Sequence, residues 1–222
     1  MNRRRLRNLA RKRLGENVAA FWTDDELNDY INDAGHDVVE KAKCIKANGY
    51  ITTVADTAEY TISSNFSNYL AVTEVYMYQD ATTWRRLDQT NRDRLKREQP
   101  GWKSADNGVP NEYYWDKEED VLGVFPKPNS TNAGTNYLQV YYADGYTDIT
   151  SDDDEPAGVS HMLQLAMVDY VVALGYETRG WGDKANDAFK KYYFKIKEYL
   201  VDRDTEKQED DEGIVMKNYR NI

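Results

Sequence analysis

The spacing of apolar residues changes twice along the chain, and this change most constrains the fold. Leu27, Ile31, Ala34, Val38 and Ala42 lie three or four positions apart, which is typical of an amphipathic helix. From about residue 50 to residue 146 the spacing becomes two, in short runs rich in Tyr, Val and Ile that predict strands. Helical spacing returns after residue 155. This order predicts an α+β fold and does not suit alternating βαβ units.

We expect four parts: an antiparallel helical bundle, an inserted antiparallel β-rich subdomain, and one segment at each end. Residues 1–15 form a basic N-terminal helical arm that ends at Gly15, and residues 16–48 and 151–202 form the bundle. Thr23 and Glu26 predict a capping box, and Pro156 suits a first helical position. Residues 49–150 form the subdomain, and residues 203–222 form an extended C-terminal tail.

Short runs in the β-rich part predict seven strands, at residues 50–54, 59–63, 69–78, 84–87, 112–115, 121–125 and 137–142. A short helix is expected at residues 91–99, and residues 116–120 connect a hairpin. Most of the 18 tyrosines lie in or near these runs. A half-buried pleated surface suits their amphipathic rings.

The N-terminal arm is strongly basic although the whole chain has a net charge of −10. The arm carries +7, so the remaining 207 residues carry −17. Such an arm is expected to dock onto an acidic partner or a neighbouring copy. The alternative is a helix that packs on its own bundle with a solvated basic face. The seven arm cations are Arg3, Arg4, Arg5, Arg7, Arg11, Lys12 and Arg13.

The C-terminal tail combines an acidic stretch with a more apolar end. Residues 202–212 contain seven Asp or Glu. The end of the chain then supplies Ile214, Val215, Met216, Tyr219, Arg220 and Ile222. A polar linker with apolar anchors is typical of a segment that becomes ordered on a partner. A dispensable frayed terminus is the alternative.

No pattern predicts a catalytic, cofactor or metal site, so we do not expect an enzyme. The single cysteine, Cys44, excludes an internal disulfide, and two histidines, His36 and His161, offer little for a metal site. Residues 175–180 match the start of a P-loop but lack its Lys, and are interpreted as a turn between helices. Residues 152–155 lack the later ligands of an EF-hand and are interpreted as a solvated helix start.

Targeting signals are also missing from the pattern. The basic start lacks the apolar core of a signal peptide, and no apolar run reaches the roughly 20 residues that a membrane span needs. We therefore expect a soluble, unexported protein that does not bind membranes.

Several stretches in order resemble tailed-bacteriophage head–tail connector proteins, also called adaptor or head-completion proteins. The resemblance covers about residues 16–200. It rests on FWTDDELNDYINDA at residues 21–34, WRRL at 84–87, GVPNEYY at 108–114, VFPKP at 124–128, VYY at 140–142 and the acidic Glu-Pro pair at 155–156.

The resemblance implies a structural virion protein at the head–tail interface. Such proteins form a ring, usually dodecameric, below the portal, where they extend the DNA channel, retain the genome and provide the tail attachment platform. The implied partners are the portal protein, neighbouring copies, a downstream tail, nozzle or stopper protein, and double-stranded DNA that passes without sequence-specific binding. The seven arm cations and the six residues of the tail end are the candidate portal- or subunit-binding residues.

Two other functions remain open. A carbohydrate-binding β-module would use aromatic stacking, and it predicts a monomer with an exposed Trp84, Trp102 or Trp115. A DNA-binding regulator would use the basic arm, and it predicts salt-sensitive duplex binding.

Overall fold

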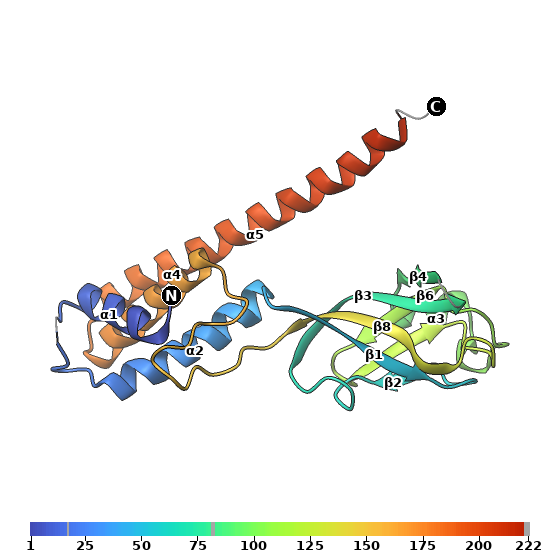
Figure 1. Ribbon diagram of the computed structural model, residues 1–222, viewed down its shortest axis with the longest axis horizontal. Helices are drawn as coiled ribbons and strands as arrows, with labels where there is room; N and C mark the ends of the chain where they lie inside the picture. Colours follow the sequence, from blue (N-terminus) through green and yellow to red (C-terminus); the bar gives the residue numbers. More distant parts are fainter. Residues whose placement is uncertain (17, 81–82, 220–222) are drawn as a thin grey trace. The chain divides into compact units, whose positions relative to one another are not determined.

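The computed structural model describes residues 1–16, 18–80 and 83–219, except for the side chains of residues 80 and 205–219. The chain divides into two compact units, and each is described by itself. Unit 1 comprises Met1–Ile45 and Tyr146–Ile222, and unit 2 comprises Lys46–Gly145. The predicted α+β class is confirmed, because unit 1 is helical and unit 2 contains two mainly antiparallel sheets (Figure 1).

Four helices of unit 1 pack against one another. They are α1 (Arg3–Leu14), α2 (Asp24–Ala42), α4 (His161–Thr178) and α5 (Gly182–Tyr219). Helix α4 contacts each of the other three. It is accordingly apolar on nearly all sides, with Leu163, Met167 and Val171 fully buried.

Short-range capping signals explain where these helices begin and end. The Thr23 hydroxyl accepts a hydrogen bond from the Glu26 N–H at 3.1 Å, and the Glu26 carboxylate accepts one from the Thr23 N–H at 2.8 Å. The predicted capping box is therefore confirmed. Gly15 ends α1 in the left-handed region at a φ of 85°, as the C-cap prediction requires.

The predicted helix start at Pro156 is wrong. Helix α4 begins at His161, and Ser160 is its N-cap, with the hydroxyl accepting a hydrogen bond from the Leu163 N–H. Gly158 has a φ of 69°. A helix that began at Pro156 could not continue through this left-handed position.

The C-terminal end of unit 1 also differs from the prediction. An extended tail was expected from residue 203, but the backbone of α5 is helical as far as Tyr219. This stretch contains no proline, and its Glu, Lys, Gln and Met residues have high helix propensities. None of the described helices is long and apolar enough to cross a membrane.

Unit 2 contains two four-stranded sheets. Sheet A has the order β1 (Lys46–Thr53), β8 (Gly134–Asp144), β3 (Tyr69–Asp80) and β4 (Thr83–Arg86). Sheet B has the order β2 (Glu59–Thr61), β7 (Val121–Phe125), β6 (Glu112–Asp116) and β5 (Asp88–Gln89). The seven predicted strands are present, with bounds that differ by a few residues. Strand β5 was not predicted, because a strand of two residues is too short to show an alternation of apolar and polar side chains.

The two sheets share an apolar core. Val75, Met77 and Val140 of sheet A cluster with Leu122 and Val124 of sheet B, and all five side chains are fully buried. Antiparallel pairing of β6 with β7 confirms the predicted hairpin at residues 116–120. The first and last strands of the unit pair with each other, so Lys46 lies opposite Ala143.

A second, smaller cluster includes side chains from sheet B. Helix α3 (Arg92–Glu98), predicted at residues 91–99, contributes Leu95, and the 3-10 turn Trp102–Ser104 contributes Trp102. Both pack with Tyr114 and Phe125 of the sheet. Side chains from the helix, the turn and the sheet thus form a second, smaller core in unit 2.

Candidate interaction surfaces

Helix α1 packs within unit 1 and does not project as a free arm. Leu6, Ala10 and Leu14 are buried, as their helical spacing predicted. Arg7 and Arg11 are also buried, with Arg11 only 4% exposed. A buried guanidinium requires hydrogen-bonded carboxylate or carbonyl partners, so the surroundings of α1 must supply them.

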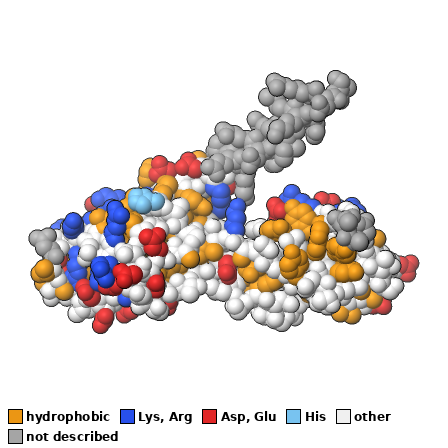
Figure 2. All heavy atoms as spheres, viewed as in Figure 1, with side chains coloured by type: hydrophobic (Ala, Val, Ile, Leu, Met, Phe, Trp, Pro, Cys, Tyr) orange, Lys and Arg blue, Asp and Glu red, His pale blue; other side chains and the backbone are white. Residues whose placement is uncertain are grey.

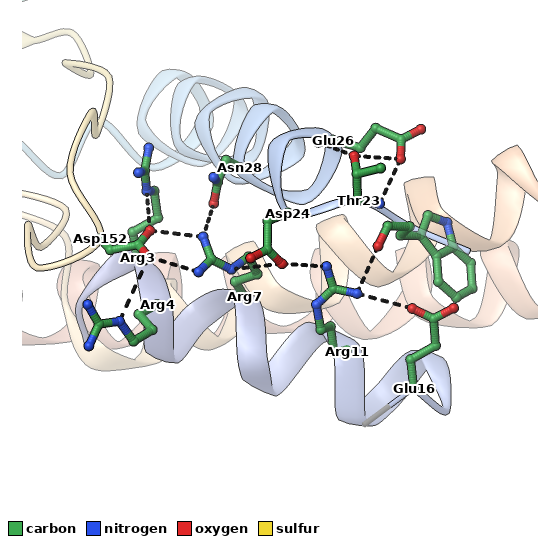
Figure 3. Close-up of polar contacts among 11 residues, drawn as sticks. Arg3, Arg4, Arg7, Arg11, Glu16, Thr23, Asp24, Glu26, Asn28 and Asp152 are labelled. Carbon is green, nitrogen blue, oxygen red and sulfur yellow. Dashed lines mark hydrogen bonds and ion pairs between the residues drawn. The ribbon is translucent and has the colours of Figure 1, made fainter. Parts of the chain in front are cut away.

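Asp152 is the partner of three arginines of α1, Arg3, Arg4 and Arg7 (Figure 3). Arg7 donates hydrogen bonds of 2.9 and 2.8 Å to the two Asp152 carboxylate oxygens and a third, of 2.9 Å, to the Asn28 side chain. Arg3 donates to Asp152 at 3.1 Å. The hydrogen bonds from Arg7 and Arg3 lower the pKa of Asp152 to about 2. The interpretation of residues 152–155 as a solvated helix start is therefore wrong for Asp152.

Arg11 holds the segment between α1 and α2 (Figure 3). Its guanidinium donates to the Trp22 carbonyl at 2.8 Å, to Glu16 at 3.1 Å and to Asp24 at 2.6 Å. Glu16 in turn accepts a hydrogen bond from the Phe21 N–H at 2.8 Å. One buried cation thus connects α1 to the start of α2.

Asp169 is a buried carboxylate that joins three helices. It lies on α4 and forms ion pairs with Arg13 of α1 and Lys195 of α5. Its side chain is 5% exposed, so both cations approach it from the edge of the unit. Two positive partners compensate the cost of burying one negative charge.

The seven arm cations therefore divide into two groups. Arg3, Arg7, Arg11 and Arg13 form ion pairs inside unit 1. Arg4 also forms ion pairs, 3.8 Å from Asp152 and 3.4 Å from Asp153, but its side chain is exposed. Arg5 and Lys12 are exposed and form no ion pair with another described residue. Figure 2 shows Lys and Arg side chains gathered over α1. Only this second group is available to a partner.

The candidates at the C-terminal end lie mostly beyond the described part. Ile214, Val215, Met216 and Tyr219 belong to the last turns of α5, and their side chains are outside the described residues. Arg220 and Ile222 are outside them altogether. Their role stays a prediction.

A second basic surface lies between α1, α4 and α5, and sequence reasoning missed it. It surrounds a cavity of about 530 Å³ lined by Arg13, Lys184, Lys191 and Lys195 together with Asp169 and Asp187. We call it the basic cavity. Lys184 and Lys191 are exposed and form no ion pair with a described residue. Their spacing of seven positions along α5 was the available signal, because it places them on one side of a helix.

The outward face of α2 is acidic. Asp25, Asp29 and Asp33 follow one another at intervals of four, and Glu40 continues the face. All four are exposed, and none forms a hydrogen bond or ion pair through its carboxylate with a described residue. We call these four residues the acidic ridge.

Sheet A exposes an aromatic face on the side away from its core. It includes Tyr50, Tyr76, Tyr78, Trp84 and Tyr141, and the ring of Tyr137, which packs against the core, lies 4.7 Å from that of Tyr78. The Trp84 ring lies 5.2 Å from that of Tyr78 and 6.0 Å from that of Tyr50. Figure 2 shows hydrophobic side chains gathered over unit 2. Trp84 is 38% exposed, whereas Trp102 is 4% exposed and Trp115 is partly buried.

The remaining residues singled out in the sequence have ordinary surroundings. Residues 175–178 are the end of α4, and only residues 179–181 connect it to α5, so the interpretation of residues 175–180 as a turn between helices is right only for its last two residues. His36 is exposed beside Asp148, His161 is exposed at the start of α4, and Cys44 is partly buried. The described residues contain no group of three His, Cys, Asp or Glu side chains that could hold a metal ion.

Comparison with known proteins assigns a family to this arrangement. A family model described as SU10 adaptor protein matches residues 1–213, and so includes α1, all of unit 2 and most of α5. No curated protein matches the sequence. Because the family model spans nearly the whole chain, the chain belongs to the SU10 adaptor protein family and is a structural adaptor protein of a bacteriophage.

Proposed function

We propose that copies of this chain form a ring on the portal protein below the filled capsid, as a head–tail connector. The ring extends the DNA channel, retains the packaged genome and provides the platform to which a tail, nozzle or stopper protein attaches. The role is structural and not enzymatic, and the chain assembles in the host cytoplasm before it becomes part of the virion. The observation that carries this proposal is the family match over residues 1–213.

The charge of the chain supports passage of DNA without binding. The net charge is −10. A surface with the same sign of charge as DNA offers few cations that could displace the counterions condensed on the phosphate backbone. The same charge opposes association of free copies, so the ring forms on the portal as template.

The C-terminal end supplies the anchor to the portal in this proposal. Residues 213–222 contain five apolar or aromatic side chains, Ile214, Val215, Met216, Tyr219 and Ile222. Burying them on a partner would offset the entropy lost when these side chains are fixed at the contact.

Mixing the chain with the portal protein of the same phage tests the proposal. Negative-stain imaging and native mass spectrometry should show closed rings with the portal and dissociated copies without it. Deletion of residues 213–222 should abolish portal capture in a pull-down, while the helical circular dichroism should lose only the contribution of the last turns of α5. A closed ring without any portal would contradict the template, and full capture of the truncated chain would contradict the anchor. A chain that stays monomeric and does not bind the portal protein would contradict the proposed connector function.

Carbohydrate binding is the second candidate, and the aromatic face of sheet A is the observation that favours it. Trp84 is exposed among tyrosines, and such surfaces stack on pyranose rings. Titration of host surface polysaccharide should then quench the Trp84 fluorescence, with Trp84→Phe as the matched control. A DNA-binding regulator has less support, because five of the seven arm cations form ion pairs within unit 1.

A further inference from the structure

We propose that the acidic ridge of one copy docks into the basic cavity of the next copy. This inference rests on the ring of the proposed function and specifies its contact between subunits. It assigns two surfaces that lie on different faces of unit 1, one on α2 and the other between α1, α4 and α5 (Figure 1).

The basic cavity has positive charge that the chain does not compensate. Asp169 is already shared between Arg13 and Lys195, and Asp187 forms an ion pair with Lys190 at 3.1 Å. Lys184 and Lys191 are left without a carboxylate partner among the described residues. The cavity therefore suits a ligand with two or more negative charges.

An exposed aromatic ring lies next to this charge. Phe194 is 65% exposed and lines a neighbouring cavity of about 430 Å³ with Lys190, Lys191, Lys195 and Glu198. Of these lysines only Lys191 forms no ion pair with a described residue. An exposed ring beside such a lysine is typical of an interface, where apolar area supplies affinity and charge selects the partner.

The acidic ridge has the charge and the length to fill this surface. Asp25, Asp29 and Asp33 span eight positions of α2, which is about 12 Å along a helix. Their carboxylates form no ion pair with a described residue, so docking would not break an internal contact. The ridge presents them at intervals of about 6 Å, and two of them can face Lys184 and Lys191 together.

Charge also decides how the copies must be arranged. A ridge cannot pair with a second ridge, nor a cavity with a second cavity, because like charges would face each other. Contact between the two surfaces is therefore heterologous, with each copy using one face toward each neighbour. Heterologous contacts generate rings when the rotation closes. The two surfaces and the proposed ring thus require the same geometry.

A DNA backbone is the other polyanion that the basic cavity could take. The net charge of −10 repels a duplex as a whole, and only two cations of the cavity are without ion pairs. A helix of three carboxylates from a second copy matches this small cluster better. We therefore assign the cavity to a neighbouring copy.

Charge reversal on each face provides the test, in mixtures with the portal protein of the same phage. Asp29→Lys with Asp33→Lys reverses the ridge, and Lys184→Glu with Lys191→Glu reverses the cavity. Each double variant alone should lower the fraction of chains in rings by about tenfold or more, because two like-charged faces meet. An equimolar mixture of both variants should restore rings in which they alternate. The fourfold variant, which carries all four changes, should assemble alone.

Matched controls separate charge at these faces from charge in general. Asp106→Lys with Glu118→Lys reverses two exposed carboxylates of unit 2 and should leave assembly unchanged. Circular dichroism should show that all variants keep their helices, since none of the substituted side chains forms an ion pair with a described residue.

The outcomes also distinguish this inference from the proposed function. Wild-type rings together with intact assembly of either double variant would overturn the docking and leave the connector role standing. Losses that neither the mixture nor the fourfold variant repairs would overturn it as well. Gel-shift binding of a short duplex that is lost in Lys184→Glu with Lys191→Glu, with assembly unaffected, would assign the cavity to DNA. Failure of the wild-type chain to form any ring would overturn both proposals.

Discussion

The interactions that stabilise the inside of unit 1 differ from those that stabilise the inside of unit 2. Unit 1 buries charged groups, and Arg7 joins α1 to Asp152, 145 positions away. Arg11 joins α1 to the start of α2, and Asp169 joins α4 to α1 and α5. In unit 2 the buried polar groups include tyrosine hydroxyls at the edge of an aromatic and aliphatic core, such as Tyr60 and Tyr114. Unit 1 should therefore respond to changes of charge and pH, and unit 2 to changes of volume.

Removal of a buried cation should have the largest effect, and only in unit 1. Arg11→Met keeps the volume of the side chain but leaves Glu16 and the Trp22 carbonyl without their donor. We expect a loss of about 3 kcal/mol in the free energy of unfolding, because an unpaired buried carboxylate is costly. Urea denaturation followed by circular dichroism measures this loss. Arg5→Met is the matched control, and a similar loss there would contradict the role of burial.

A small increase in volume should break unit 2 selectively. A Cβ atom added at Gly123 of β7 would lie 2.0 Å from the ring of the buried Tyr114. Gly123→Ala should therefore destabilise the unit by about 2 kcal/mol, as overpacking of a filled core does. Hydrogen exchange should rise in peptides of unit 2 and stay unchanged in α2 and α4. The pair Gly123→Ala with Tyr114→Leu should recover part of the loss.

Acid should weaken unit 1 through Asp152, and this is the smallest of the three effects. The pKa of Asp152 is lowered to about 2 from an ordinary value of 3.8, so its contribution is present above pH 4 and is lost as the pH falls toward 2. Partial exposure limits this contribution to about 1 kcal/mol. Asp152→Asn should show that deficit near neutral pH and converge with the wild type in acid.

The neighbouring acid provides the control for this pH dependence. Asp153→Asn changes a side chain that is exposed and lies 3.4 Å from the exposed Arg4. Urea midpoints measured between pH 5 and pH 2.5 should therefore coincide for Asp153→Asn and the wild type. A pH dependence that persists in Asp152→Asn would assign the acid sensitivity to other groups.

The sequence alone predicts what depends on neighbours along the chain. Alternation located the strands of unit 2, and the Thr23 and Glu26 pair located the start of α2. The partners of the arm could not be found in this way, because Arg7 and Asp152 are 145 positions apart. The charge of α1 favoured a basic arm that docks onto a partner. The sequence does not distinguish an arginine that is buried in an ion pair from one that is exposed to solvent. The polar stretch after residue 202 predicts an extended tail, but its residues favour a helix, and α5 continues to Tyr219.

The pairing of Lys46 with Ala143 brings the two ends of unit 2 next to each other. The chain therefore leaves the helical unit and returns to it through neighbouring strands. An insert with adjacent ends can be exchanged for another domain, or shortened to a tight turn, without altering how the host helices meet. Recombination between phages can thus vary the β-rich part while the helices that we assign to subunit contact are inherited unchanged.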